Sequence, residues 1–167
     1  GNGKSNTKTN VIPDSDPESS IKTFEILNHV QDDNTLVNKN VLDRWILSLL
    51  EKLRSDVTEA LENYNTVNAV TAIDDFVSEL ATWYIRRSRD RVGENAKSEE
   101  DKQAFYQTTH HVLATLCKLA APIIPFITDS MYQNLTGAKS VHLETWPDEN
   151  RMMRDLELER KMASTRT

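Results

Sequence analysis

The sequence predicts an all-α protein, an antiparallel bundle of four to five helices with one short extended segment near residues 140–146. Only four glycines and five prolines occur in 167 residues, so few turns are available. Apolar residues recur at three- and four-residue spacing over several long stretches, which places them on one face of an α-helix. Such faces are stabilised mainly by packing against one another, so we expect the helices to share one core.

The N-terminal region divides into two parts. Residues 1–20 carry almost no apolar side chains and include two prolines, so we expect a flexible linker or disordered end. Residues 21–147 are expected to form the helical domain. Its first element is a short helix that docks on the main body through five apolar residues: Ile21, Phe24, Ile26, Leu27 and Val30.

Two long helices follow as antiparallel neighbours. An apolar pattern runs from about residue 38 to residue 64 and includes Trp45, and asparagines at both ends supply capping and turn chemistry. The chain reverses near Asn65 and enters a second helix that ends around Arg91. The second helix carries a buried stripe of Val70, Ile73, Phe76, Val77, Leu80, Ala81 and Tyr84.

Capping residues and prolines place two further helices. Ser98 is a capping residue with Asp101 at the third position, so a third helix begins there. Pro122 and Pro125 end this helix and start a short fourth one, because proline fits a first turn and not a helix interior. Gly137 is the expected C-cap of the fourth helix.

The last part of the chain is less apolar. Residues 140–146 alternate apolar and polar side chains, so we expect an extended segment that lies along the bundle and does not pair in a sheet. We expect residues 148–167 to form a charged helical extension toward a missing domain. This extension is too weakly apolar to stand alone, so it either packs loosely or needs a partner from outside the chain.

One concentrated basic stretch closes the second long helix. Arg86, Arg87, Arg89 and Arg91 occur within six residues, one turn after Trp83. Guanidinium groups match phosphate oxygens and an aromatic neighbour can stack on a base, so these five residues are a candidate RNA-binding surface. The alternative is a solvated helix end, because arginines near a helix C-terminus complement the helix dipole.

The four arginines are not expected to be equivalent. Arg87 and Arg91 continue the stripe of Leu80 and Tyr84, so their stems are expected to pack on the bundle. Arg86 and Arg89 diverge from that stripe and are expected to face outward.

Composition excludes several other functions. The chain has 20 basic and 26 acidic residues and a net charge of -6, so any RNA contact is local. One cysteine excludes an internal disulfide and fits a reducing compartment. Because no apolar run reaches the roughly 18 residues that span a bilayer, we expect a cytoplasmic protein without a membrane partner. The adjacent His110 and His111 diverge by about 100 degrees on a helix, so we expect no metal site.

Several stretches resemble, in order and spacing, the helical anticodon-binding domain of isoleucyl-tRNA synthetase. They are VLDRWILSLL at 41–50, ALENYN at 60–65, AIDDFVSELATWYIRRSRDR at 72–91, LAAPIIPFITDSMYQNL at 119–135 and SVHLETWP at 140–147. The Trp-Tyr pair and the Ala-Pro-x-x-Pro-Phe turn are shared by several class I synthetases. The run at residues 84–91, YIRRSRDR, is similar to the isoleucyl enzyme in particular.

The resemblance implies that the chain binds the anticodon stem and loop of an isoleucine-specific tRNA and positions it for the catalytic domain of a parent chain. Neither the His-Ile-Gly-His nor the Lys-Met-Ser-Lys-Ser signature, which bind ATP in this family, occurs here. We therefore expect a fragment without a catalytic residue or a cofactor of its own, and a monomer. The parent would be an isoleucine-tRNA ligase that uses ATP with Mg²⁺.

Three other functions remain open from the sequence. The chain could be the anticodon-binding domain of another class I synthetase, of valyl type. It could be a structural or protein-interaction bundle in which the arginines pair with acidic side chains and RNA is not bound. It could also be an autonomous enzyme, which a lack of turnover would dismiss.

Overall fold

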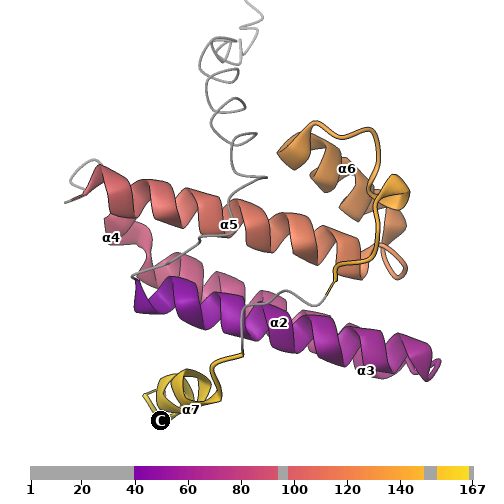
Figure 1. The fold of residues 1–167 in the computed structure, drawn as a ribbon, viewed down its shortest axis with the longest axis horizontal. Coiled ribbons are helices and arrows are strands. Elements are labelled where there is room, and N and C mark those ends of the chain that lie inside the picture. Colours follow the sequence, from indigo (N-terminus) through magenta and orange to yellow (C-terminus); the bar gives the residue numbers. More distant parts are fainter. Residues whose placement is uncertain (1–39, 94–97, 149–153, 166–167) are drawn as a thin grey trace, which may run out of the picture. The chain divides into compact units, whose positions relative to one another are not determined.

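The structure, a computed structural model, describes residues 40–93, 98–148 and 154–165. The predicted linker at residues 1–20 and the predicted helix at residues 21–30 lie outside the described residues. In the described part the all-α prediction is confirmed (Figure 1). The elements are α2 (Val41–Glu62), α3 (Thr66–Glu79), the π-helix η2 (Leu80–Ile85), α4 (Arg89–Val92), α5 (Glu99–Ala120), α6 (Pro125–Thr136), the 3-10 turn η3 (Val141–Leu143) and α7 (Leu156–Ser164).

Helices α2 and α3 form an antiparallel hairpin, as the sequence predicts (Figure 1). The side chain of Asn40 accepts a hydrogen bond from the N–H of Leu42 at 2.9 Å and so caps α2. Asn65 caps α3 in the same way, through the N–H of Asn68 at 3.1 Å. Between the helices Tyr64 has φ of 55°, the left-handed conformation that reverses the chain.

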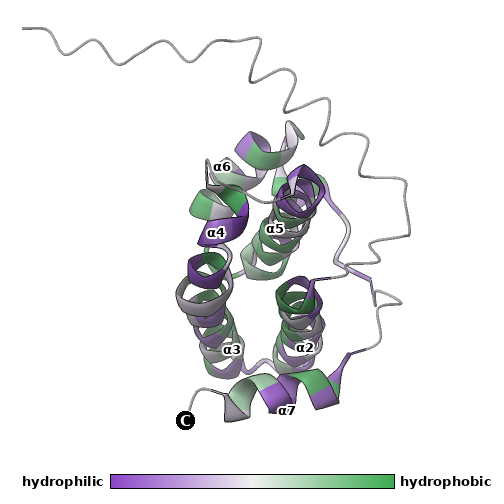
Figure 2. Ribbon diagram, turned by 90° about the vertical axis from the view of Figure 1, so that its left-hand side faces the viewer, coloured by the Kyte–Doolittle hydropathy of each residue, from purple (hydrophilic) through white to green (hydrophobic). Residues whose placement is uncertain are grey.

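The caps of α5 and α6 are also those predicted. Ser98 accepts a hydrogen bond from the N–H of Asp101 and starts α5. Pro125 occupies the first turn of α6, and Gly137 ends it with φ of 69°. Figure 2 shows the hydrophobic faces of α2, α3 and α5 turned toward one another. The core between them contains Trp45, Ile46, Leu50, Leu53, Val57, Phe76, Leu80, Tyr84, Phe105, Val112, Leu116 and Leu119.

The buried stripe of the second long helix is narrower than predicted. Phe76, Leu80 and Tyr84 are buried, but Val70 and Val77 are exposed. Ala81 is exposed as well. The reason is that α3 packs on one side against α2 and leaves the opposite side to solvent, so only residues near the centre of the apolar arc are covered.

The expected extended segment near residues 140–146 is wrong at residues 141–143, where the chain forms η3. The carboxylate of Asp129 accepts hydrogen bonds from the Ser140 hydroxyl at 2.7 Å and from the N–H of Val141 at 2.9 Å. The Ser140 oxygen in turn accepts from the N–H of His142 at 3.2 Å. These bonds stabilise a tight turn where the alternating pattern alone indicates an extended backbone.

Helix α7 finds a partner within this chain. It lies against the side of the α2–α3 hairpin that faces away from α5 (Figures 1 and 2). Leu158 and Met162 pack against the core. The Ser48 hydroxyl on α2 donates to Glu159 at 2.6 Å and accepts from the N–H of Asp155 at 2.9 Å. The weakly apolar α7 is thus held on α2 by polar as well as apolar contacts.

Candidate nucleic-acid interface

The arginine-rich stretch lies where the helical geometry of the second long helix changes. The chain passes from α3 into the π-helix η2, continues as helix at Arg86 and Arg87, and breaks at Ser88, whose φ is -87° and ψ is 1°. A π-helix widens the turn and shifts which side chains face the core. Tyr84 and Ser88 are both fully buried, so they continue the inward face of Leu80.

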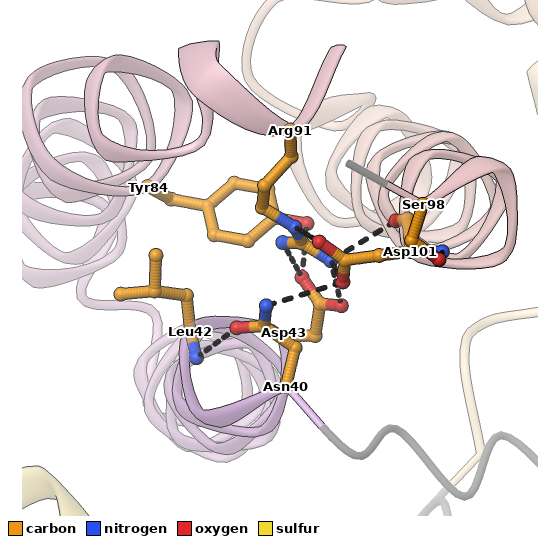
Figure 3. Close-up of polar contacts among 7 residues, drawn as sticks. All are labelled: Asn40, Leu42, Asp43, Tyr84, Arg91, Ser98 and Asp101. Atoms are coloured by element: carbon orange, nitrogen blue, oxygen red, sulfur yellow. Dashed lines mark hydrogen bonds and ion pairs between the residues drawn. The ribbon is translucent and has the colours of Figure 1, made fainter. Parts of the chain in front are cut away.

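Tyr84 and Arg91, seven residues apart, bind the same buried carboxylate. Asp43, in the first turn of α2, is fully buried. Its two oxygens accept hydrogen bonds from Nη1 and Nη2 of Arg91, each at 2.7 Å. The Tyr84 hydroxyl donates to Oδ1 of Asp43 at 2.8 Å. Figure 3 shows the phenol and the guanidinium converging on Asp43 from different turns of the chain.

A second carboxylate completes the coordination of Arg91. Asp101, in the first turn of α5, accepts from Nε of Arg91 at 2.8 Å and from Nη2 at 2.7 Å. The side-chain amide of Asn40 donates to Asp101 at 3.2 Å (Figure 3). Arg91 therefore joins the N-terminal turns of α2 and α5, where the helix dipoles also favour carboxylates.

The pKa shifts agree with this geometry. Hydrogen bonds from Arg91 lower the pKa of Asp101. Burial by itself lowers the pKa of the Arg91 guanidinium, but hydrogen bonds to Asp43 and Asp101 outweigh it and the pKa of Arg91 is raised. Burial, followed by the negative charge of Asp43, raises the pKa of the Tyr84 phenol. The cluster thus keeps the Tyr84 phenol protonated and the Arg91 guanidinium charged.

The other three arginines face solvent. Arg86, Arg87 and Arg89 are exposed, and within residues 40–93, 98–148 and 154–165 none of them forms an ion pair. The guanidinium carbon of Arg87 lies 4.7 Å from the centre of the Trp83 ring. Trp83 packs edge-on against the buried Trp45, with ring centres 6.5 Å apart. Arg87 therefore rests on an aromatic surface that is anchored in the core.

The structure separates the five predicted site residues into two groups. Arg86 and Arg89 face outward and Arg91 faces inward, as expected. Arg87 was expected to pack its stem on the bundle: it lies over Trp83 of the bundle but remains exposed, and Ser88 takes the buried position. One face of the Trp83 ring is covered by Arg87, so stacking of a base on that face would require Arg87 to move.

Sequence reasoning missed the role of the two carboxylates. Asp43 occupies a position of the buried face of α2, with Ile46 and Leu50 three and seven residues further on. A charge inside an apolar stripe needs a partner of opposite sign, because an isolated buried charge is very costly. That signal in the sequence would have pointed to Asp43, and Arg91 lies on the corresponding inward face of the second long helix.

The adjacent His110 and His111 of α5 have different surroundings. His110 binds the backbone oxygen of Leu135 at 2.9 Å through Nε2. Burial, with the neighbouring His110 and Lys118, lowers the pKa of His111. In the portions of the chain that are described, no three His, Cys, Asp or Glu residues are grouped to hold a metal ion. In the same portions no helix is long and apolar enough to cross a membrane.

Comparison with known proteins identifies this kind of domain. The family model described as the anticodon-binding domain of tRNA ligase matches residues 43–166. The chain belongs to this family. The match covers the hairpin, the arginine-rich stretch and every later helix, so the anticodon-binding domain includes α7.

Similar proteins are isoleucine–tRNA ligases from bacteria. The chain is 42% identical over 132 residues to the Clostridium novyi protein, which covers 75% of the chain and 13% of the relative. It is 44% identical over 126 residues to the Treponema denticola protein, in an alignment that covers 74% of this chain and 11% of the relative. It is 42% identical over 126 residues to a Bacillus thuringiensis protein, in an alignment that covers 75% of this chain and 12% of the relative. The chain therefore spans about an eighth or less of the length of these relatives, the part that matches the anticodon-binding domain.

Proposed function

We propose that this anticodon-binding domain holds the anticodon stem and loop of an isoleucine-specific tRNA, with Arg86, Arg87 and Arg89 on the phosphate backbone. The observation that carries the proposal is the exposure of these three arginines on one short stretch, without ion pairs among the described residues. Guanidinium groups bind phosphate oxygens through two parallel hydrogen bonds. Contacts of this kind position an RNA without reading its sequence.

Trp83 and Arg91 have supporting roles in this proposal. Trp83 holds the Arg87 side chain over its ring and so limits the entropy that Arg87 loses on binding. Arg91 has its donors directed to Asp43 and Asp101, so its contribution is to the shape of the stretch.

The proposal extends to a longer protein. The relatives are named isoleucine–tRNA ligases, and their name favours isoleucine over the valyl alternative. We propose that a catalytic domain elsewhere in such a protein joins isoleucine to the tRNA with ATP and Mg²⁺, while this chain positions the tRNA as a monomer in the cytoplasm. The chain by itself is then expected to catalyse no ATP–pyrophosphate exchange.

A charge-reversal experiment tests the proposal. The double variant Arg86→Glu, Arg89→Glu should bind an isoleucine-specific tRNA transcript more weakly than the unchanged chain in a fluorescence titration, with the same melting temperature. Each lost phosphate contact should lower the slope of log affinity against log salt by roughly 0.7–0.9, the value per contact on DNA strands.

A matched control separates local contacts from net charge. The double variant Lys139→Glu, Arg160→Glu makes the same formal charge change at two exposed residues outside the stretch. It should bind tRNA more tightly than the Arg86→Glu, Arg89→Glu variant. Equal losses in both variants would indicate nonspecific attraction. A stability loss without any RNA effect at Arg86 and Arg89 would favour the purely structural bundle.

A further inference from the structure

Tyr84 and Arg91 bind one carboxylate, and the exposed arginines lie between them. The Tyr84 hydroxyl and the Arg91 guanidinium reach Asp43 from two points seven residues apart. Figure 3 shows both contacts with Asp43 in the first turn of α2, so a shift of the intervening residues along the bundle would break these hydrogen bonds. The break at Ser88 lies inside this span, where the Ser88 N–H donates to the Tyr84 backbone oxygen and the Ser88 backbone oxygen accepts from the Arg91 N–H, each at 3.0 Å. The contacts with Asp43 add a connection from this locally bonded segment to α2.

We propose that Asp43 and Arg91 are positioning residues for RNA binding, which hold Arg86, Arg87 and Arg89 in the arrangement that meets the tRNA backbone. This inference rests on the proposed function. The buried ion pair then affects RNA binding at a surface to which neither of its two side chains belongs.

Stability alone does not account for a buried pair of this kind. Removing two charges from water is costly, and a well-packed apolar pair is often equally or more stable at such a position. An apolar pair, however, has no preferred direction. The fork of Arg91 on the two oxygens of Asp43 fixes both the distance and the orientation of α4 against α2.

A second contact supports the same role. Arg91 also binds Asp101, so the position of α4 is set against α5 as well as against α2. The guanidinium lies 5.6 Å from the centre of the Phe105 ring, which closes the cluster on its apolar side. Two helices, α2 and α5, thus determine where the segment carrying the exposed arginines lies.

The variant Asp43→Asn gives a test in which charge and position predict opposite signs. It removes one negative charge, so electrostatics alone predicts equal or tighter tRNA binding. If Asp43 positions the arginines, binding should weaken about fivefold, the effect of roughly one phosphate contact at 0.1 M salt. The slope of log affinity against log salt should fall in parallel. Asp90→Asn is the matched control, an exposed carboxylate in the same stretch, and should bind as tightly as the unchanged chain or more tightly.

Two further variants keep the test decisive if Asp43→Asn fails to fold by circular dichroism. Arg91→Lys keeps the charge but cannot make the fork, and should weaken binding about fivefold as well. Tyr84→Phe removes one hydroxyl and no charge, and should weaken binding about twofold. All titrations are made with the full 167-residue chain at a temperature at which each variant is folded.

The outcomes distinguish this inference from the proposed function. If Arg86→Glu, Arg89→Glu weakens binding but the folded variants at Asp43, Arg91 and Tyr84 bind with unchanged affinity and salt slope, the pair is structural only and the inference is overturned. If Arg86→Glu, Arg89→Glu has no effect on binding, the proposed function fails first. The positioning role would be established if Arg91→Lys and Asp43→Asn both weaken tRNA binding while Asp90→Asn does not.

Discussion

Arg91 and Asp43 form a two-point ion pair, in which each terminal nitrogen of the guanidinium lies 2.7 Å from a different carboxylate oxygen. The two side chains are unequally supported by their surroundings. Arg91 keeps a second carboxylate, Asp101, when Asp43 is removed. When Arg91 is removed, the one hydrogen-bond donor that Asp43 keeps among the described residues is the Tyr84 hydroxyl. This asymmetry has a measurable effect on stability.

We expect Arg91→Ala to be more destabilising than Asp43→Ala. Removing one partner of a buried ion pair costs about 3–5 kcal/mol, because the other charge is left uncompensated. Arg91→Ala should fall in this range and Asp43→Ala below it, as measured by urea unfolding. The exposed Asp90→Ala is the control and should change the free energy of unfolding by less than about 0.5 kcal/mol. A larger cost for Asp43→Ala would contradict the assigned role of Asp101.

Replacing Gly137 and Gly93 by alanine should have different effects on the stability of the chain. Gly137 ends α6 with φ of 69°, where a Cβ is strained, so Gly137→Ala should cost about 1–2 kcal/mol. Gly93 ends α4 with φ of -66°, and among the described residues an added Cβ would meet only the Arg89 backbone oxygen at 3.7 Å. Gly93→Ala should be neutral or stabilise by up to about 1 kcal/mol through the unfolded chain. Thermal melts of the two variants check the difference, and similar losses in both would refute it.

The stability of the chain should decrease between pH 7 and pH 5 in a way that depends on His111. Burial lowers the pKa of His111 in the folded chain, so the unfolded chain binds a proton more readily. The stabilising contribution of the neutral form is therefore present above about pH 6.5 and is lost as the pH falls toward the lowered folded value. Urea unfolding of His111→Gln should show a weaker pH dependence. The exposed His142→Gln is the control, and an equal effect of both changes would argue against burial as the cause.

The docking of α7 should depend on Ser48. Its hydroxyl both donates to Glu159 and accepts from the N–H of Asp155, so Ser48→Ala leaves a backbone donor without its bond. We expect a cost of about 1–2 kcal/mol and faster trypsin cleavage after Arg160. The control is Ser55→Ala, an exposed position on the same helix. Unchanged cleavage of the Ser48 variant would show that apolar contacts alone hold α7.

Features that depend on neighbouring residues were predictable from the sequence. The boundaries of α2, α5 and α6 follow from apolar periodicity and from caps such as Ser98 and Gly137, because each cap acts within about one helical turn. The exposure of Arg86 and Arg89 follows from the same periodicity. The resemblance of residues 84–91 to isoleucyl-tRNA synthetases pointed to the family that the comparison confirms.

Features that depend on distant residues were decided by the tertiary structure. The turn at residues 141–143 exists because Asp129, on another element, binds Ser140 and Val141. The inward position of Ser88 in place of Arg87 follows from the π-helix, which alters the phase of the helix within a single turn.

The sequence alone determined that a charged arginine closes an amphipathic helix, but not which carboxylate it binds. Asp43 and Arg91 are 48 residues apart, and many acids lie at a similar separation from Arg91. The selection was made when the hairpin and α5 packed, because only then did two first-turn carboxylates come within hydrogen-bonding distance of one guanidinium, and the Tyr84 hydroxyl within hydrogen-bonding distance of Asp43. Local periodicity sets which face of a helix is buried, whereas the packing of the whole core sets which charges on that face meet.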